Sequence, residues 1–179
     1  MYKLIKKIFR RLARLFLINR SNKNAQKIKI DAPSDVLVKA KVLKVIDGDS
    51  VLLWMFEQEI EIRLYAIDCP EGNQPWGSNA THALKRLIDY KNVYMQKFGI
   101  DHHGRTLAVL FLDNSGEFIN VNEYMVKCGH AWVFRIYYGR LPRQSQRKLN
   151  QLERWAKTKQ VGLWKHKNPI PPWEWRKRA

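Results

Sequence analysis

A chain of 179 residues with 45% apolar residues is long enough for one domain with a hydrophobic core, which excludes a disordered polymer. Two cysteines, Cys69 and Cys128, exclude a disulfide-rich scaffold and leave open either one bridge or two free thiols. The formal net charge of +17 indicates a polyanionic partner, either nucleic acid or an anionic membrane surface.

The positive charge is concentrated at the two ends of the chain. Residues 1–29 hold ten Lys or Arg and no acid, and residues 139–179 hold twelve against two acids. Residues 30–138 hold eleven basic and fourteen acidic residues, so the middle is mildly acidic. A solubilising surface would give the same total, and charge alone does not identify the partner.

Residues 1–18, MYKLIKKIFRRLARLFLI, have apolar side chains at helical spacing and most of their Lys and Arg on the other side. This pattern predicts a basic amphipathic helix that lies on anionic membranes or phosphate surfaces. The longest unbroken apolar run, 15–18, is too short to span a bilayer, and Arg14 interrupts any signal-peptide core. We therefore expect a cytoplasmic or membrane-surface location rather than secretion, although the sequence does not fix the compartment.

Five segments rich in β-branched and aromatic residues predict strands at 36–46, 51–56, 60–67, 93–98 and 106–113. The first two are separated by Asp47-Gly48-Asp49-Ser50, which is a turn signal. In the third, alternation places Ile62 and Leu64 on one face and Arg63 on the other.

Three helices are expected beside these strands. One runs over 78–90 with Ser78 as its N-cap, a short one over 121–128 is closed by Gly129, and the last covers 144–160. Three consecutive strands come first, and the later strands alternate with helices. This order predicts an α+β fold, a small and mostly antiparallel barrel with helices on its side.

Acidic residues are the best candidates for chemistry, because the sequence has no glycine-rich phosphate loop, GxSxG, HExxH or CxxC. His102 and His103 are expected to be exposed in a loop. Taken alone, Asp47-Gly48-Asp49 is a turn, and 68–71 is a strand end followed by a helix start. One hairpin joins the two acidic segments, however, so they could lie side by side.

Residues 41–71, KVLKVIDGDSVLLWMFEQEIEIRLYAIDCPE, resemble the start of staphylococcal nuclease-like (thermonuclease) domains. The shared pattern is an Ile-Asp-Gly-Asp-Ser-Val turn, an Arg-Leu pair and an Asp-x-Pro-Glu segment. Residues 101–108, DHHGRTLA, resemble the family's Asp-x-Tyr-Gly-Arg-x-Leu-Ala segment, and Val121-Asn122 with Gly129 and Ala131 resembles its short helix and following strand.

The ending of the chain, Gly162-Leu163-Trp164 and then Pro171 to Arg176, looks like that of bacterial and plasmid-borne members. The resemblance covers about 37–165 and implies an OB-type five-stranded β-barrel with about three flanking helices. We expect three parts: a basic N-terminal segment and linker at 1–34, the nuclease-like domain at 35–166, and a basic Trp/Pro-rich tail at 167–179.

The resemblance also implies a site and a function, which is calcium-dependent endonuclease cleavage of phosphodiester bonds with little sequence specificity. The ligands of one Ca²⁺ would be Asp49, Asp68 and the main-chain carbonyl of Cys69. The catalytic residues would be Arg63, Glu71 and Arg105.

Physical chemistry agrees with this assignment. Hard carboxylate and carbonyl oxygens suit Ca²⁺, or less well Mg²⁺, rather than zinc. Two carboxylates about 4 Å apart at an effective dielectric near 20 repel each other by roughly 4 kcal/mol, so gathered acids need a cation. Arg63 and Arg105 could hold phosphate oxygens bidentately, and Glu71 could orient or deprotonate water. Asp47 either supports a metal ligand or only shapes the turn, and Ser50 could contact a metal-bound water.

Several positions depart from the family pattern. Cys69 stands where many relatives have Thr or Ala, which a carbonyl ligand tolerates, and His103 replaces the usual Tyr. Arg135 stands where some relatives present a Tyr, so Arg135, Tyr137 and His103 are candidate substrate contacts.

We expect a monomer that acts on DNA, RNA or both. Two alternatives stay open: a non-catalytic OB-fold module that binds nucleic acid, and a membrane-surface protein tethered through residues 1–18.

Overall fold

A computed structural model describes residues 37–178. The predicted N-terminal amphipathic helix and the linker over 19–34 lie outside the described residues. Within 37–178, every helix is too short or too polar to cross a membrane.

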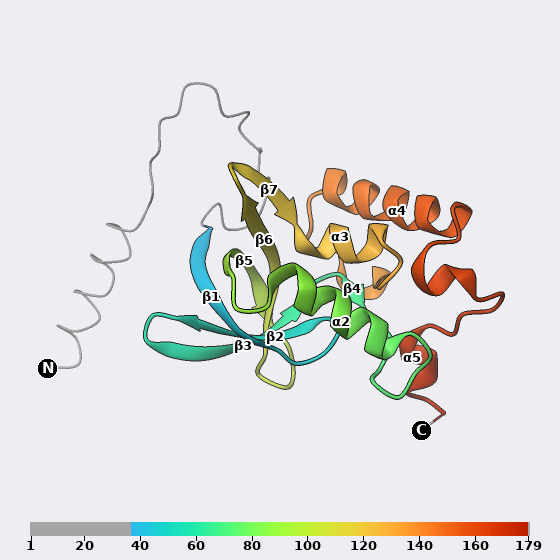
Figure 1. The fold of residues 1–179 in the computed structure, drawn as a ribbon, viewed down its shortest axis with the longest axis horizontal. Helices are drawn as coiled ribbons and strands as arrows, with labels where there is room; N and C mark the ends of the chain where they lie inside the picture. Colours follow the sequence, from blue (N-terminus) through green and yellow to red (C-terminus); the bar gives the residue numbers. More distant parts are fainter. Residues whose placement is uncertain (1–36, 179) are drawn as a thin grey trace, which may run out of the picture.

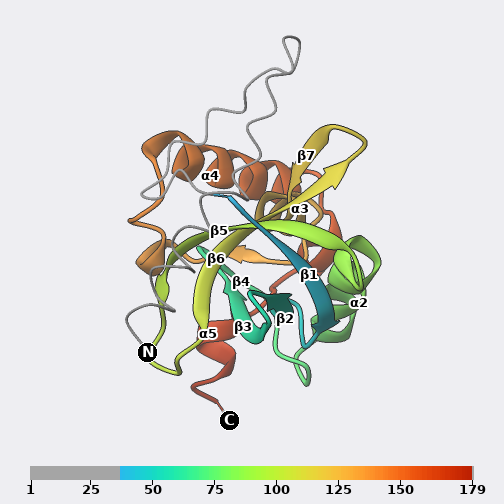
Figure 2. The ribbon, with the colours of Figure 1, turned by 90° about the vertical axis from the view of Figure 1, so that its left-hand side faces the viewer.

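Five strands form a closed barrel (Figures 1 and 2). They are β1 (Val38–Val45), β2 (Ser50–Met55), β3 (Gln58–Leu64), β5 (Asn92–Ile100) and β6 (Thr106–Asn114). Neighbours in the order β3-β2-β1-β5-β6 are antiparallel, and a parallel pairing of β3 with β6 closes the ring. A short strand, β7 (Glu117–Asn120), extends along β6. The structure thus confirms the expected five-stranded α+β barrel.

Alternation along the strands fills the barrel. Val51, Leu53 and Met55 of β2 are buried, as are Ile62 and Leu64 of β3, because every second side chain points inward. This alternation places Arg63 on the outward side of β3, as the sequence predicts.

Helix α2 (Gly77–Ile88) packs on the barrel through the predicted stripe, of which Ala80, Leu84 and Ile88 are fully buried. The expected cap at Ser78 is wrong. The N-cap position is Trp76, which has a φ of 77° and makes no capping hydrogen bond through its side chain. A tight turn from Glu71 forces this start, because a Cβ on Gly77 would lie 1.8 Å from the Glu71 carbonyl oxygen.

Helices α3 (Val121–Lys127) and α4 (Arg143–Thr158) pack together on another side of the barrel (Figure 1). Asn120 caps α3 by accepting a hydrogen bond from the Glu123 N–H, and Gly129 follows the helix at a φ of 66°, as expected.

The predicted strand over 60–67 is broken in the structure. Ala66 has a φ of 67°, which turns the chain away from the barrel. The next two residues form β4 (Ile67–Asp68), which pairs with β8 (Trp132–Val133) in a separate two-stranded sheet.

Three further short elements were not expected from the sequence. They are the 3₁₀ turns η1 (Arg135–Tyr137) and η2 (Gly162–Lys165) and the helix α5 (Pro172–Trp175).

Candidate active site

The turn between β1 and β2 brings two acidic segments together. The Asp49 N–H donates to Asp47 Oδ1 at 2.9 Å, which fixes the turn. Gly48 lies directly against the segment after β4, because a Cβ there would be 2.7 Å from the Cys69 Cβ. The Cys69 N–H also donates to Asp49 Oδ2 at 2.6 Å. The glycine therefore permits the close approach that the sequence left as a possibility.

Two carboxylates, those of Asp49 and Asp68, are buried at this junction, with exposed fractions of 1% and 0%. Arg63 reaches them because it faces Ser50 across β2 and β3. Its guanidinium bridges the pair, with Nη1 donating to Asp49 Oδ1 and Nη2 donating to Asp68 Oδ1.

The electrostatics of this cluster leave room for more positive charge. Burial raises the pKa of Asp49 well above its ordinary value, Arg63 opposes that shift, and Asp47 and Asp68 add to it. Burial alone would lower the pKa of Arg63, but Asp49 and Asp68 raise it instead. Four acids, Asp47, Asp49, Asp68 and Glu71, meet two guanidinium groups here, those of Arg63 and Arg176, so negative charge remains.

The donor set fits a hard divalent cation. Two buried carboxylates, a neighbouring main-chain carbonyl and water are the ligands that Ca²⁺ or Mg²⁺ prefers. Within residues 37–178, no group of three or more His, Cys, Asp or Glu side chains is arranged around one metal position. Protein side chains would therefore supply only part of the coordination. Both cysteines are free thiols in the structure.

Glu71 follows β4 and shares the partner Arg176 with the buried Asp68. Its side chain is 38% exposed, and its Oε1 accepts a hydrogen bond from Arg176 Nη1 at 2.5 Å. Sequence patterns did not predict this partner. Arg176 belongs to the basic ending, which we noted only for its resemblance to bacterial family members.

Arg105 lies just before β6, whose Thr106 pairs with Ile62 of β3, so it is close to the strand that carries Arg63. Its Nε donates to Asp101 Oδ2 at 2.9 Å, and its side chain is 26% exposed. Asp101 also accepts from the Arg105 N–H. No contact links the Arg105 guanidinium to Asp49, Asp68 or Glu71 in the described part of the chain.

Of the two residues expected to support the metal ligands, Asp47 holds the Asp49 main chain, as above. Ser50 is buried, with its Oγ 3.5 Å from Asp49 Oδ1.

The candidate substrate contacts lie on separate loops. Arg135 in η1 donates from Nη2 to Glu153 Oε2 at 2.6 Å, while Tyr137 is 59% exposed. His102 and His103 are exposed in the 101–105 loop, as expected, with ring centroids 3.8 Å apart.

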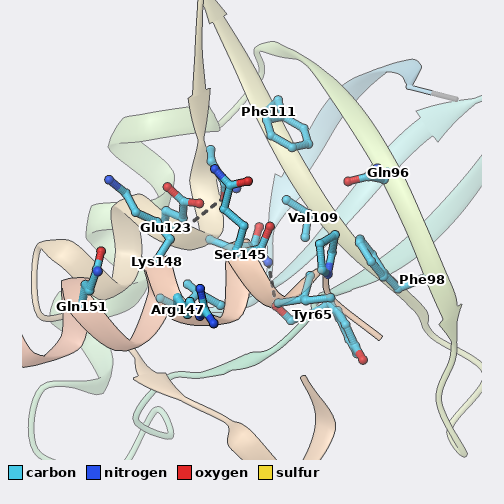
Figure 3. Close-up of a pocket in the computed structure, with 16 residues that line it drawn as sticks. Tyr65, Gln96, Phe98, Val109, Phe111, Glu123, Ser145, Arg147, Lys148 and Gln151 are labelled. Atoms are coloured by element: carbon cyan, nitrogen blue, oxygen red, sulfur yellow. Dashed lines mark hydrogen bonds between the residues drawn. The ribbon is translucent and has the colours of Figure 1, made fainter. Parts of the chain in front are cut away.

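A cavity of about 470 Å³ lies away from the acids, between the barrel and α4 (Figure 3). Stacked Tyr65 and Phe98 form part of its wall, together with Phe111 and Arg147. None of the candidate catalytic or metal-binding residues lines it.

Comparison of the sequence with known proteins places the chain in a family. The sequence model described as staphylococcal nuclease homologue matches residues 61–166. The matched range includes Arg63, Asp68, Glu71 and Arg105, and begins after Asp49.

Full-length relatives agree. An uncharacterized endonuclease of Escherichia coli O157:H7 is 33% identical over 141 residues, which are 79% of this chain and 86% of that protein. A micrococcal nuclease of Shigella flexneri is 33% identical over 155 residues, covering 84% and 87%. An uncharacterized endonuclease of Haemophilus influenzae is 36% identical over 139 residues, covering 77% and 72%.

Proposed function

Since the chain belongs to the staphylococcal nuclease family, and is a nuclease of the hydrolase class, we propose that it is a calcium-dependent endonuclease acting on DNA, RNA or both. One observation carries the proposal. Two fully buried carboxylates, Asp49 and Asp68, meet at the rim of the barrel with the Arg63 guanidinium between them. Burying several acids together carries a desolvation penalty, and such groupings are concentrated at functional sites.

Nucleases of this family depend on a metal ion. Asp49, Asp68 and the Cys69 carbonyl would hold a calcium ion here, with Asp47 and Ser50 fixing the position of Asp49. When bound, the ion would neutralise the acids and polarise a phosphoryl oxygen.

The reaction itself would be attack of water on a phosphodiester. Glu71, which reaches solvent, takes the proton from the attacking water as its oxygen bonds to phosphorus, and the P–O bond to the leaving group breaks. The Arg63 guanidinium binds both acids in the structure and would be released once an ion neutralises Asp49 and Asp68. Arg63 and Arg105 would then stabilise the charge that develops on the phosphate oxygens, because a guanidinium carries two parallel donors. Glu71 is regenerated when the proton passes to solvent or to the leaving oxygen.

Little sequence preference is expected, because the contacts proposed here are to phosphate and to base faces rather than base edges. Tyr137, exposed beside Ile136 on η1, offers a ring for stacking, and His103 and Arg135 offer polar contacts. We propose a monomer.

A cleavage assay tests the function. Purified protein is incubated with single-stranded DNA, double-stranded DNA and RNA across a calcium titration, with EGTA and with magnesium in parallel. Cleavage should require calcium, and Arg63→Ala, Glu71→Ala and Arg105→Ala should each slow it by roughly 10²-fold or more while far-UV circular dichroism is unchanged. Arg105→Lys should also be slow, because lysine keeps the charge and loses the bidentate geometry.

Binding to these polymers without cleavage under any metal condition would instead support a non-catalytic OB-fold module. A tether through residues 1–18 is a separate proposal, which rests on their basic amphipathic pattern. Flotation with anionic liposomes, comparing the intact chain with one that lacks residues 1–29, tests that proposal without reference to catalysis.

A further inference from the structure

The C-terminal segment is fixed against the barrel near the acids. The Trp173 ring stacks on Phe134 at 5.4 Å between centroids and meets Trp132 edge-on at 5.8 Å. Gln74 Nε2 donates to the Ile170 carbonyl at 2.6 Å. One set of contacts is close to Asp68, because Trp132 pairs with Asp68 in the β4–β8 sheet. The other comes from Gln74, which follows Asp68 in the chain.

Trp175 adds a second attachment, with its Nε1 donating to Asn73 Oδ1 at 3.1 Å. Helix α5 then closes with the Arg176 N–H donating to the Pro172 carbonyl at 2.9 Å. The backbone of Arg176 is therefore held on the surface of the nuclease domain.

The Arg176 side chain binds two of the candidate site acids at once. Its Nη2 donates to Asp68 Oδ2 at 2.8 Å, and its Nη1 donates to Glu71 Oε1 at 2.5 Å and lies 3.3 Å from Asp68 Oδ1. A guanidinium is suited to this geometry because it is planar and carries several donors in fixed directions.

Two features indicate that Arg176 does not occupy the proposed cation position between Asp49 and Asp68. Asp68 Oδ1 accepts from Arg63, and Asp68 Oδ2 accepts the shorter of the two contacts with Arg176, so the two guanidinium groups bind Asp68 mainly through different oxygens. No contact joins Arg176 to Asp49 in the described residues.

Glu71 depends on Arg176 for its position. Over residues 37–178, Arg176 is the one side chain or main-chain group that hydrogen-bonds the Glu71 carboxylate. A glutamate with 38% of its side chain exposed has several rotamers available in water, and fixing it in one of them costs conformational entropy. A contact to a fixed guanidinium selects one rotamer before substrate arrives.

We propose that Arg176 is a positioning residue of the nuclease reaction, which holds the Glu71 carboxylate next to Asp68 in the orientation needed to receive the proton of water. This inference rests on the proposed function. It also assigns a role in the active site to the segment after residue 166, beyond charge alone.

Kinetics of Arg176→Ala test the inference. Loss of a hydrogen bond between charged groups should lower kcat by about tenfold to a hundredfold, while KM for an oligonucleotide changes by about twofold or less. Arg176→Lys should recover part of the rate, because one ammonium can still reach a carboxylate. Arg178→Ala, which removes the same charge two residues on without an ion pair in the structure, should leave kcat unchanged and serves as the matched control.

A measurement without metal or substrate accompanies the kinetics. Urea unfolding of the metal-free wild type, Arg176→Ala, Glu71→Gln and the double variant should show non-additive losses of stability, because the two side chains interact directly.

The outcomes distinguish the positioning role of Arg176 from the proposed nuclease function. A wild type that cleaves with calcium, together with an Arg176→Ala that cleaves equally fast, or faster because a blocking cation has gone, overturns the positioning role and leaves the nuclease proposal intact. Additive stability losses also overturn it. A wild type that cleaves no polymer with any metal overturns the proposed function itself.

Discussion

Replacing Arg63 with alanine should destabilise the metal-free protein by about 3 to 5 kcal/mol at neutral pH, the usual cost of removing one partner from a buried ion pair. The structure gives the reason. Arg63 contacts Asp49 and Asp68, which are 1% and 0% exposed, so its removal leaves buried carboxylates without that partner. Asp68 keeps its contact with Arg176, so most of the cost falls on Asp49.

Calcium should reverse much of this loss. With the fixed positive charge removed, the two carboxylates should bind the ion more tightly than in the wild type, and an ion at a hundred times its dissociation constant stabilises a fold by about 2.7 kcal/mol. Urea unfolding followed by tryptophan fluorescence, in EGTA and in calcium, measures both effects.

Arg105→Ala is the control for Arg63→Ala. It also removes an arginine, but its partner Asp101 is near the surface and the pair should contribute about 1 kcal/mol or less. If Arg63→Ala in EGTA is as stable as the wild type, the buried carboxylates are not held by that charge. If calcium stabilises neither the wild type nor Arg63→Ala, Asp49 and Asp68 do not form an ion site.

Three further changes test other parts of the structure. Burial lowers the pKa of His130 to about 4, with Arg86 acting in the same direction, so its contribution to stability is complete above about pH 6.5 and is lost as the pH falls toward 4. The loss should be no more than about 3 kcal/mol for a partly buried ring, and a pH series of thermal unfolding should show a smaller slope for His130→Asn, which keeps an acceptor for Trp76 Nε1. Glu153→Ala should cost about 1 to 3 kcal/mol in urea unfolding, because it leaves the Val133 N–H without its 2.9 Å acceptor; equal stability would mean that water replaces the carboxylate. Gly48→Ala should lower the free energy of unfolding by about 1 to 3 kcal/mol through overpacking against Cys69, and should also lower the cleavage rate of the protein that remains folded; an unchanged cleavage rate would show that this close approach is not needed.

The barrel could be predicted from the sequence because its signals are local. Runs of β-branched and aromatic residues mark each strand, and Asp47 to Ser50 mark the first hairpin turn, which sets the pairing of Ser50 with Arg63. That single register is enough to bring Arg63 next to Asp49. The family pattern added Asp68 and Glu71, which share the partner Arg176, and Arg105, which lies before β6 and pairs with Asp101.

The contacts that the sequence did not reveal are long-range and involve very short elements. Ala66 adopts a φ of 67° that nothing in its side chain predicts, and the resulting two-residue ladder of β4 with β8 is too short to leave a periodic pattern. The tail from Pro171 onward reads as a basic, Trp- and Pro-rich end. Only the three-dimensional packing of Trp173 on Phe134 reveals that Arg176 lies beside Asp68 and Glu71.

The ladder between β4 and β8 has a consequence for when the protein can act. Asp68 is fixed by Trp132 across that ladder, and Val133 of the same strand is fixed in turn by Glu153 of α4. During translation, Asp49, Arg63 and Asp68 all leave the ribosome before the residues that hold Asp68 in place have been made. A growing chain would therefore carry the acids without a finished centre until the later helices have folded.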